Sequence, residues 1–539
     1  MAKKEKKQSF LGGAAILAAA VMAVKAIGFF YKIPLNNILG SEGKTHFQVA
    51  YNIYNVLLTI STAGLPLAIS KLTSEAHALG KENEKRKLFR TAIWLFFGLG
   101  LAGSLFMFIG AENLSVFMGD ESLAAWPIRA LAPAVFCVCL LACMRGYTQG
   151  QGNMKPTAVS QVLEALCKLG VGLPLAWYLL SLGRGLEMGA AGAILGVSTG
   201  TILSMCFLIF YLARHRQPTA SLDVPSSSGT LLKKVLAIGI PITLSNSAMS
   251  IITLIDNKIV LGRLHAVASV LAETPAALNG QYSMAMDLIN LPASFVYPVT
   301  MSLIPFAAAA MARQDRAGAN KIVSSALRLI ALLALPCGVG LAALATPICT
   351  MLYPMQMADA LAAGPHLQVL GFACIFICIM ILTNAILQSY GHENLPILTV
   401  IIGGVVKVAM NYVLVGNAAI NIKGAPISTL CCYAVIAGLN LFFVWKYSPE
   451  KPRYLAIFAK PVVASALMGV AAWSVHGLLQ KLLSGSLSPF GANAIGTLGG
   501  IGAGVVVYGI LVLALRILTA EDLASLPKGD KIARILRIK

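Results

Sequence analysis

The chain carries little charge for its length. Only 12% of its 539 residues are Asp, Glu, Lys or Arg, whereas 58% are hydrophobic. A soluble protein of this size does not need so large an apolar share, and apolar stretches of about 20 residues are typical of membrane-spanning helices. The stretches do not alternate as the strands of a membrane barrel do, which excludes that class. We therefore predict an all-α polytopic membrane protein.

The sequence also lacks the short motifs of common enzymes. It contains no HExxH and no GxxxxGK[ST] sequence, and no pair of carboxylates stands on a polar loop. The seven histidines are scattered, and the eleven cysteines fall in apolar stretches without a histidine at zinc spacing. We expect no catalytic residue, no cofactor and no metal site, and hence no enzyme.

Acidic residues are scarce, with 21 Asp and Glu against 41 Lys and Arg, for a net charge of +20. The basic residues concentrate at both ends and in every second loop, which is the positive-inside pattern of a membrane protein. This distribution predicts a multi-pass protein of the cell membrane with both termini in the cytoplasm, and it argues against nucleic acid as a partner. Five basic residues fall on the other side: Lys44, Arg184, Arg263, Lys423 and Lys481.

Apolar blocks long enough to cross a bilayer recur along the chain, and they predict fourteen transmembrane helices. The loops between them are short, and 218–229 reads as a plain linker. The blocks cover about 10–38, 46–71, 91–111, 124–147, 157–181, 189–213, 233–262, 281–312, 322–345, 364–389, 395–416, 424–446, 454–476 and 493–519.

An internal repeat relates the first six helices to the next six. IPLNNILG, ending at Gly40, matches IDNKIVLG, ending at Gly262, and a polar stripe on the second helix recurs on the eighth. Six helices separate the copies, so the repeats are parallel, with a binding site expected in a central cavity where they meet. The predicted parts are a six-helix bundle (1–216), a cytoplasmic linker (217–232), a second six-helix bundle (233–448), and two extra helices with a basic tail (449–539).

Two lysines stand inside the first apolar block. Lys25 and Lys32 are seven residues apart and lie on one side of a helix. Lysines in hydrocarbon are costly and usually face a bundle interior or a watery cavity, although Lys32 could instead snorkel to the interface. The next block carries a one-sided polar stripe that either lines the same cavity or joins helices by hydrogen bonds. Its residues include Gln48, Asn52, Asn55 and Thr59.

The seventh and eighth blocks carry further polar groups. Asp256 and Lys258 are two residues apart and do not face each other. Asp256 or Asp287 could bind Na⁺ or a proton, and helix–helix hydrogen bonding is an equal alternative. The polar stripes here comprise Asn246, Ser250, Thr253 and Asn257 on the seventh helix, and Asp287 and Asn290 on the eighth.

Other embedded charges have local interpretations. Glu164 and Lys168 are four residues apart in the order that favours an ion pair on one helix. Arg145 lies near the end of its block and is expected to snorkel. In the last block Gly496, Gly500 and Gly504 repeat at steps of four, which lets another helix or a lipid chain approach closely.

Three stretches carry a family resemblance: VKAIGFFYKIPLNNILGSEG, STAGLPLAISKLTSEA and RGYTQGQGNMKPTAVSQVLE. They resemble the stage V sporulation protein B and polysaccharide-export branch of the multidrug/oligosaccharidyl-lipid/polysaccharide (MOP) flippase superfamily, close to the lipid II flippases of the mouse virulence factor branch. The likeness spans the whole chain. It implies two bundles around a central cavity and alternating access that moves an undecaprenyl-diphosphate-linked sugar outwards.

The resemblance also implies roles for individual residues. Lys25 matches a basic residue that the lipid II branch has three positions before a Gly, here Gly28, whereas the position three after it is Tyr31, with Lys32 next. Lys25, Lys32 and Lys258 would attract the diphosphate, assisted by Lys407 or Lys168. Gly496, Gly500 and Gly504 would suit a groove for the polyprenyl tail. The expected substrate is lipid II or a related cell-wall precursor, with membrane potential, Na⁺ or H⁺ as driver. A cation-coupled multidrug antiporter of the same fold is the alternative, although its cavity should be acid-rich.

Overall fold

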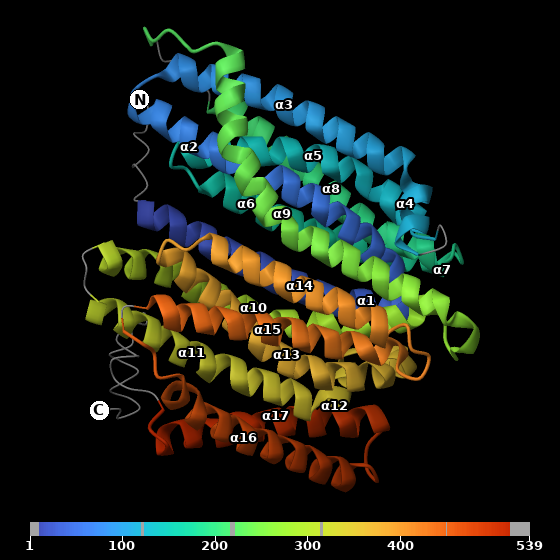
Figure 1. Ribbon diagram of the computed structural model, residues 1–539. Helices are drawn as coiled ribbons and strands as arrows, with labels where there is room; N and C mark the ends of the chain where they lie inside the picture. Colours follow the sequence, from blue (N-terminus) through green and yellow to red (C-terminus); the bar gives the residue numbers. More distant parts are fainter. Residues whose placement is uncertain (1–9, 120–122, 216–220, 313–315, 449, 518–539) are drawn as a thin grey trace. The chain divides into compact units, whose positions relative to one another are not determined.

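The computed structural model describes residues 10–119, 123–215, 221–312, 316–448 and 450–517, and within these ranges every regular element is a helix. The chain forms two compact units, Met1–His265 and Ala266–Lys539 (Figure 1). The first unit contains α1 (Phe10–Thr62), α2 (Leu65–Ala78), α3 (Glu82–Ile109), α4 (Ala111–Met118), α5 (Ala125–Gly150), α6 (Lys155–Cys167), α7 (Leu173–Ser181), α8 (Leu186–Arg214) and α9 (Ser228–Ala266). The second contains α10 (Pro275–Ala312), α11 (Arg316–Ala343), α12 (Ala345–Leu352), α13 (Met357–Ser389), α14 (Asn394–Leu414), α15 (Gly424–Tyr447), α16 (Tyr454–Leu483) and α17 (Pro489–Ala514).

The all-helical membrane architecture is confirmed. Eleven stretches of the described chain are long and apolar enough to cross a bilayer. The first, Ala19–Ala78, has 60 residues, enough for two crossings at the helical rise of about 1.5 Å per residue. α9 and α10 include positions whose side chains lie outside the described part, and they are not among the eleven. The total of fourteen spans stays a prediction.

The first two predicted spans are not separated by a loop. α1 continues through 39–45 as a kinked helix, with Gly40 at φ 65° and ψ −172°, a backbone conformation that essentially only glycine adopts. Lys44, expected in an outer loop, is fully buried, and its ammonium lies 5.6 Å from the centre of the Phe47 ring. The polar sequence GSEGKTH indicated a loop between two helices. In the structure it begins at the kink and forms the next turn of the same helix.

α1 ends instead at Thr62, and α2 begins at Leu65 with a proline in its first turn. A Cβ at Gly64 would collide with the carbonyl oxygen of Gly239 on α9. The chain therefore breaks where α9 crosses it closely. Leu231 and Val235 of α9 join a core with Leu65 of α2 and Leu88 of α3. By its contacts α9 belongs to the first unit, while the repeat boundaries at 216 and 233 stay a prediction.

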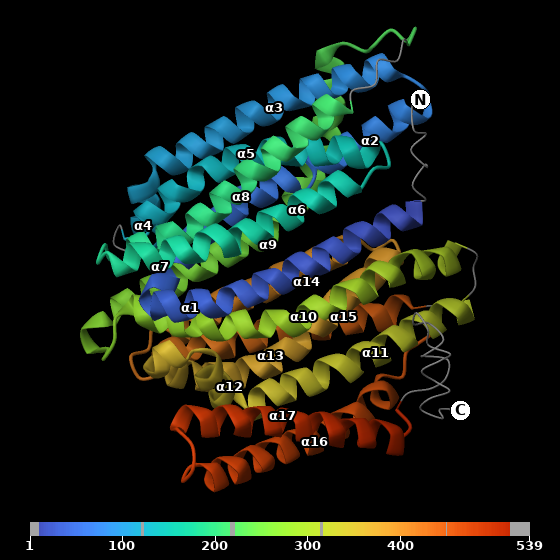
Figure 2. The same cartoon turned by 180° about the vertical axis from the view of Figure 1, so that it is seen from behind.

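The second unit is organised around α13, which packs against α10, α11 and α15. α16 and α17 lie side by side (Figures 1 and 2) and dock on this unit through α11 and α12. Polar contacts fix the docking. Asn493 donates to the Pro347 carbonyl at 3.2 Å, and the Tyr508 hydroxyl donates to the Leu332 carbonyl at 3.0 Å. The two additional helices are thus an integral part of the second unit.

Close packing of α17 on α16 gives a testable contrast between two glycines of one helix. A Cβ at Gly500 would lie 2.7 Å from the Ala472 carbonyl oxygen, whereas a Cβ at Gly502 would meet nothing within 4 Å. Gly500→Ala should lower stability by about 1–3 kcal/mol through overpacking. Gly502→Ala should be neutral or slightly stabilising. Thermal unfolding of the two purified variants checks this, and equal melting temperatures would contradict the packing.

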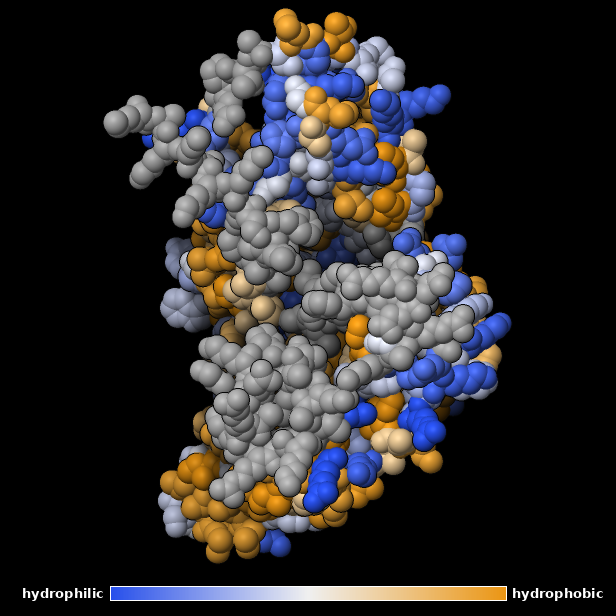
Figure 3. Space-filling model, turned by 90° about the vertical axis from the view of Figure 1, so that its left-hand side faces the viewer, coloured by the Kyte–Doolittle hydropathy of each residue, from blue (hydrophilic) through white to orange (hydrophobic). Residues whose placement is uncertain are grey.

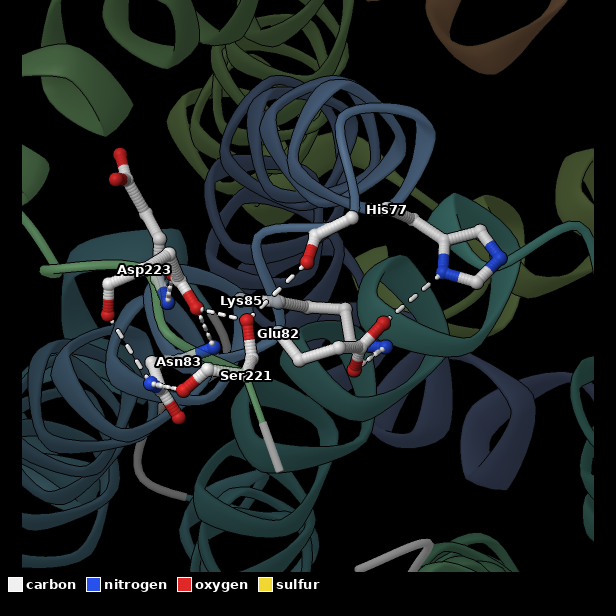
Figure 4. Close-up of polar contacts among 8 residues, drawn as sticks. His77, Glu82, Asn83, Lys85, Ser221 and Asp223 are labelled. Atoms are coloured by element: carbon white, nitrogen blue, oxygen red, sulfur yellow. Dashed lines mark hydrogen bonds and ion pairs between the residues drawn. The ribbon is translucent and has the colours of Figure 1, made fainter. Parts of the chain in front are cut away.

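The segment before α9 is held against the start of α3, although its sequence indicated a plain linker. The Asp223 carboxylate accepts hydrogen bonds from the backbone N–H groups of Asn83 at 3.0 Å and Glu84 at 2.8 Å. The Asn83 side chain donates to the carbonyls of Ser221 and Asp223 (Figure 4). Since the first N–H groups of a helix have no partner within it, Asp223 caps α3 from a distant part of the chain.

We expect this cap to depend on the charge of Asp223. Although desolvation acts to raise it, the hydrogen bonds from Ser221 and from the N–H groups of Glu84 and Asn83 hold the pKa of Asp223 below its ordinary value. Because this carboxyl has a lower pKa in the folded chain than in the unfolded chain, its charged form stabilises the folded state at pH values above the unfolded pKa of about 3.9. This stabilisation is lost as the pH falls through the folded pKa. The cap should therefore be complete at neutral pH and loosen only below about pH 4.

Asp223→Asn should weaken the cap at neutral pH. Amide hydrogen exchange over 80–88 should become faster, because the N–H groups of Asn83 and Glu84 lose a charged acceptor. Glu75→Gln changes an exposed residue of α2 with the same change of charge and serves as the control. Unchanged exchange in Asp223→Asn would show that the cap is not needed to hold the segment.

Candidate functional site

Lys25 and Lys32 lie on one helical segment, the part of α1 before the kink. The Lys25 side chain is exposed and that of Lys32 is half-buried. The two positions are about 10 Å apart along the helix axis. Two lysines on one face of an apolar helix can attract an anion to that face. Their role in binding stays a prediction.

Several polar side chains of the predicted stripe on α1 form hydrogen bonds within their own helix. The Gln48 amide donates to the Asn52 side-chain oxygen at 2.7 Å, and the Thr59 hydroxyl donates to the Asn55 carbonyl at 2.7 Å. Asn52 is buried, while the other three side chains are half-buried. Hydrogen bonds along one helix leave few groups for a ligand, so part of the stripe has the structural role that the sequence left open.

The stripes of α1 and α9 meet within the first unit. The hydroxyl oxygens of Thr59 and Ser250 are 2.9 Å apart and share a hydrogen bond. Thr253, one turn further along α9, is exposed. The side chain of Asn246 lies outside the described residues. Two polar stripes separated by almost 200 residues are therefore brought together, and Thr59 and Ser250 mark their contact.

The charged turn of α9 has three residues with different environments. Asp256 is buried. The side-chain oxygen of its neighbour Asn257 is also buried and accepts no hydrogen bond. The Lys258 ammonium lies 3.3 Å from the centre of the Phe117 ring on α4, a cation–π contact. Lys258 therefore packs against α4.

The predicted pair of Glu164 with Lys168 is not formed as such. The Glu164 carboxylate accepts from the Arg145 guanidinium at 3.2 Å, and Arg145 Nε donates to the Ser160 hydroxyl at 2.9 Å. Lys168 lies close to the phenol of Tyr51 on α1 and to the Glu164 carboxylate. The spacing rule considers only neighbours on the same helix, whereas Arg145 comes from α5. Arg145 does not snorkel, because it is paired inside the unit.

Lys168 also begins an irregular turn. Residues Lys168–Gly172 form a π-helix between α6 and α7, with a proline at the start of α7. A π-turn inside a helix is frequent at functional sites and re-aims the side chains around it. The sequence features that mark this region are the charges Glu164 and Lys168 in an apolar block, together with Pro174. They did not indicate that Arg145 and Tyr51 would be the neighbouring residues.

The second unit holds the remaining candidate polar residues. Asp287 on α10 is buried. Asn290 is exposed and donates to the Met286 carbonyl of its own helix at 2.9 Å. Lys407 is half-buried on α14. Their part in substrate or ion binding stays a prediction. Among the described residues, no group of three or more His, Cys, Asp or Glu side chains could hold a metal ion.

The glycine face of α17 contacts α16. A Cβ at Gly496 would lie 3.0 Å from His476, and one at Gly504 would contact Ala472 and Met468 at 3.4 Å. Of the two alternatives that the spacing allowed, close approach of another helix is the one observed. A lipid-tail groove at these glycines stays untested, and the packing of α16 argues against it.

Two helical units with polar and charged side chains inside apolar helices define a multi-pass membrane protein of transporter architecture. The chain belongs to the polysaccharide biosynthesis protein family, whose model matches residues 10–311. It is 28% identical over 531 residues to the uncharacterized membrane protein YabM of Bacillus subtilis, covering 97% of this chain and 96% of that one. From the same organism, stage V sporulation protein B is 25% identical (97% and 98% covered), and lipid II flippase MurJ is 23% identical (88% and 90% covered).

Solved structures show the same fold. A lipid II flippase MurJ in an inward closed conformation superposes with a TM-score of 0.69 at 16% identity, covering 93% of this chain and 99% of that one. An inward-facing multidrug resistance MATE family transporter of the MOP superfamily gives 0.62 at 17% identity, with 79% and 97% covered. The expected helical fold is therefore confirmed, as is the resemblance to stage V sporulation protein B and to lipid II flippases.

Proposed function

We propose that this protein is a flippase for a polyprenyl-diphosphate-linked saccharide, lipid II or a related cell-wall precursor, and moves it from the cytoplasmic to the outer leaflet by alternating access. Family membership supports transport of a lipid-linked precursor, since relatives of similar length include a protein named lipid II flippase. The observation that carries the anionic substrate is the pair Lys25 and Lys32 on one segment of an apolar helix. A diphosphate is an anion that two cationic side chains on one face attract.

The orientation that goes with this function has both termini in the cytoplasm of a cell-membrane protein. The excess of Lys and Arg at the chain ends and in every second loop supports it. In the proposed site Lys25 and Lys32 hold the diphosphate, with Lys168, Lys258 or Lys407 assisting. Amide and hydroxyl groups of the polar stripes, such as Thr253, hydrogen-bond the sugars.

A cation-coupled multidrug antiporter of the same fold is the second candidate. Buried Asp256, beside the unbonded side-chain oxygen of Asn257, favours it, because a carboxylate and an amide oxygen are ligands for Na⁺. In the flippase the same pair would serve ion coupling, with Asp287 as the other candidate. The basic pair on α1 is the feature that an antiporter for cationic drugs does not explain.

The test is transport by the purified protein in liposomes. Fluorescent lipid II, a second polyprenyl-diphosphate sugar and a cationic dye are offered separately, under an imposed membrane potential, Na⁺ gradient or pH gradient. We expect movement of at least one lipid-linked sugar and none of the dye. Dye transport without movement of any lipid-linked sugar would replace the flippase with the antiporter.

A further inference from the structure

A pocket of about 570 Å³ lies within the first unit where α3 and α9 begin. Its wall on α3 carries Arg86, Lys87 and Arg90, followed by Trp94, and its wall on α9 carries Leu232. The space-filling view onto this end of the molecule shows hydrophilic residues interspersed with hydrophobic ones at the top of the picture (Figure 3). None of the residues that line this described pocket is acidic. The pocket is separate from the polar stripes around Thr59 and Ser250.

The basic side chains are arranged for one anion. Arg86, Arg90 and Trp94 follow at steps of four, so they share one face of α3. Arginine binds phosphate through two parallel hydrogen bonds, and Lys87 adds a third cation. Trp94 is 69% exposed next to them, and tryptophan concentrates at the level of lipid headgroups. This order of residues matches the boundary between water and hydrocarbon.

A second, open groove lies along α9 and shares Leu232 with the pocket. Apart from Lys233 its lining is apolar, and it follows the helix past Leu236 and Ile240 to Pro241. From Leu232 to Ile240 the helix rises about 12 Å. A cationic mouth joined to an apolar groove fits a molecule with an anionic head and a hydrocarbon chain better than it fits a soluble anion.

The capped segment before α9 adds two exposed aliphatic side chains. Leu222 and Val224 are 103% and 91% exposed, while Ser221 and Asp223 between and beside them are held on α3 by hydrogen bonds. In an extended segment alternate side chains point to opposite sides. Fixing one side therefore presents Leu222 and Val224 outwards, where water is unfavourable and a lipid interface is favourable.

We propose that this pocket binds an anionic phospholipid of the surrounding membrane. Its phosphate contacts Arg86, Lys87 and Arg90, Trp94 lies at headgroup level, and one acyl chain follows Leu232, Leu236 and Ile240. The proposal uses the orientation given above, with the start of α3 on the cytoplasmic side, but not the identity of the transported substrate. A bound lipid would join α3 to α9, the helix that carries Ser250 and Asp256.

The experiment measures quenching of tryptophan fluorescence by brominated lipids in nanodiscs holding the full-length protein. Brominated phosphatidylglycerol is compared with brominated phosphatidylcholine at increasing mole fraction, and Trp94→Phe identifies the contribution of Trp94. We expect stronger quenching by phosphatidylglycerol at low mole fraction. Arg86→Gln with Arg90→Gln should raise the half-saturating fraction about 10- to 30-fold, because each basic residue near an anionic lipid surface contributes about a fivefold preference.

The control removes two positive charges from the same unit without touching the pocket. Lys155→Gln with Arg214→Gln changes exposed residues at the start of α6 and the end of α8. This variant should quench like the unaltered protein. If the Arg86, Arg90 variant does not fold, the unaltered protein still gives a test, since salt should weaken quenching by phosphatidylglycerol and not by phosphatidylcholine.

Three results would overturn the proposal. Equal quenching by the two lipids would remove the preference for an anionic headgroup. An equal shift in the control variant would show that only overall charge matters. Displacement of phosphatidylglycerol by inorganic phosphate at similar concentration would indicate a site for soluble anions without a lipid chain. No transport is measured, so failure here leaves the proposed flippase function unaffected.

Discussion

Lys25→Ala should abolish transport of a lipid-linked saccharide in liposomes while the protein still folds and inserts. A diphosphate that enters a cavity of low dielectric needs cations, because an unpaired buried charge is far costlier than a paired one. Lys25 and Lys32 lie on one apolar segment, where charged side chains are costly and usually functional. Replacing one of the two lysines with alanine removes one of the two positive charges on this segment.

The variants that accompany Lys25→Ala separate charge from shape. Lys25→Arg should retain part of the transport, since the charge stays while the compact ammonium becomes a planar fork. Lys258→Ala should have a smaller effect, because its ammonium already packs on the Phe117 ring. Lys481→Ala removes an exposed lysine at the end of α16 and should behave as the unaltered protein. Full transport by a well-expressed Lys25→Ala, Lys32→Ala double variant would leave the fold standing and the anionic substrate unsupported.

Sequence periodicity predicted which residues share a face, and the structure agrees where neighbours on one helix decide. The steps of three and four from Gln48 to Thr59 and from Ser250 to Asn257 mark two stripes, and the bond between Thr59 and Ser250 joins them. The apolar blocks likewise predicted most helices to within a few residues, because hydrocarbon requires long helical runs.

Predictions failed where a distant segment supplies the partner. The rule for charges four apart assigned Glu164 to Lys168, but Arg145 from another helix forms the ion pair with Glu164 at 3.2 Å. The polar letters around Lys44 read as a loop, because nothing local shows that a kink at Gly40 keeps them helical and buried. The cap on α3 could not be predicted from the sequence for the same reason, because Asp223 lies 140 residues from Asn83.

The ion pair of Arg145 with Glu164 gives the second large effect, this time on stability. Their side chains are only 14% and 17% exposed, and Ser160 holds the guanidinium in place. Breaking a buried pair by removing one partner costs about 3–5 kcal/mol, because the other charge stays behind without compensation. We therefore expect both Arg145→Ala and Glu164→Ala to unfold at clearly lower temperature.

The two substitutions should not be equal, because a third charge stands nearby. After Arg145→Ala, Lys168 lies four residues from Glu164 on the same side of the helix and can turn towards it. After Glu164→Ala, Arg145 and Lys168 remain as two cations without an acid between them, so this variant should be the less stable.

The matched control is Arg129→Ala, on the same helix as Arg145. The ion-pair partner of Arg129, Glu112, is 64% exposed, and exposed pairs contribute only about 0–1 kcal/mol. Thermal unfolding of the three purified variants, followed by size-exclusion chromatography after heating, gives the order. If Arg145→Ala and Arg129→Ala unfold at the same temperature, the Arg145–Glu164 pair does not stabilise the first unit.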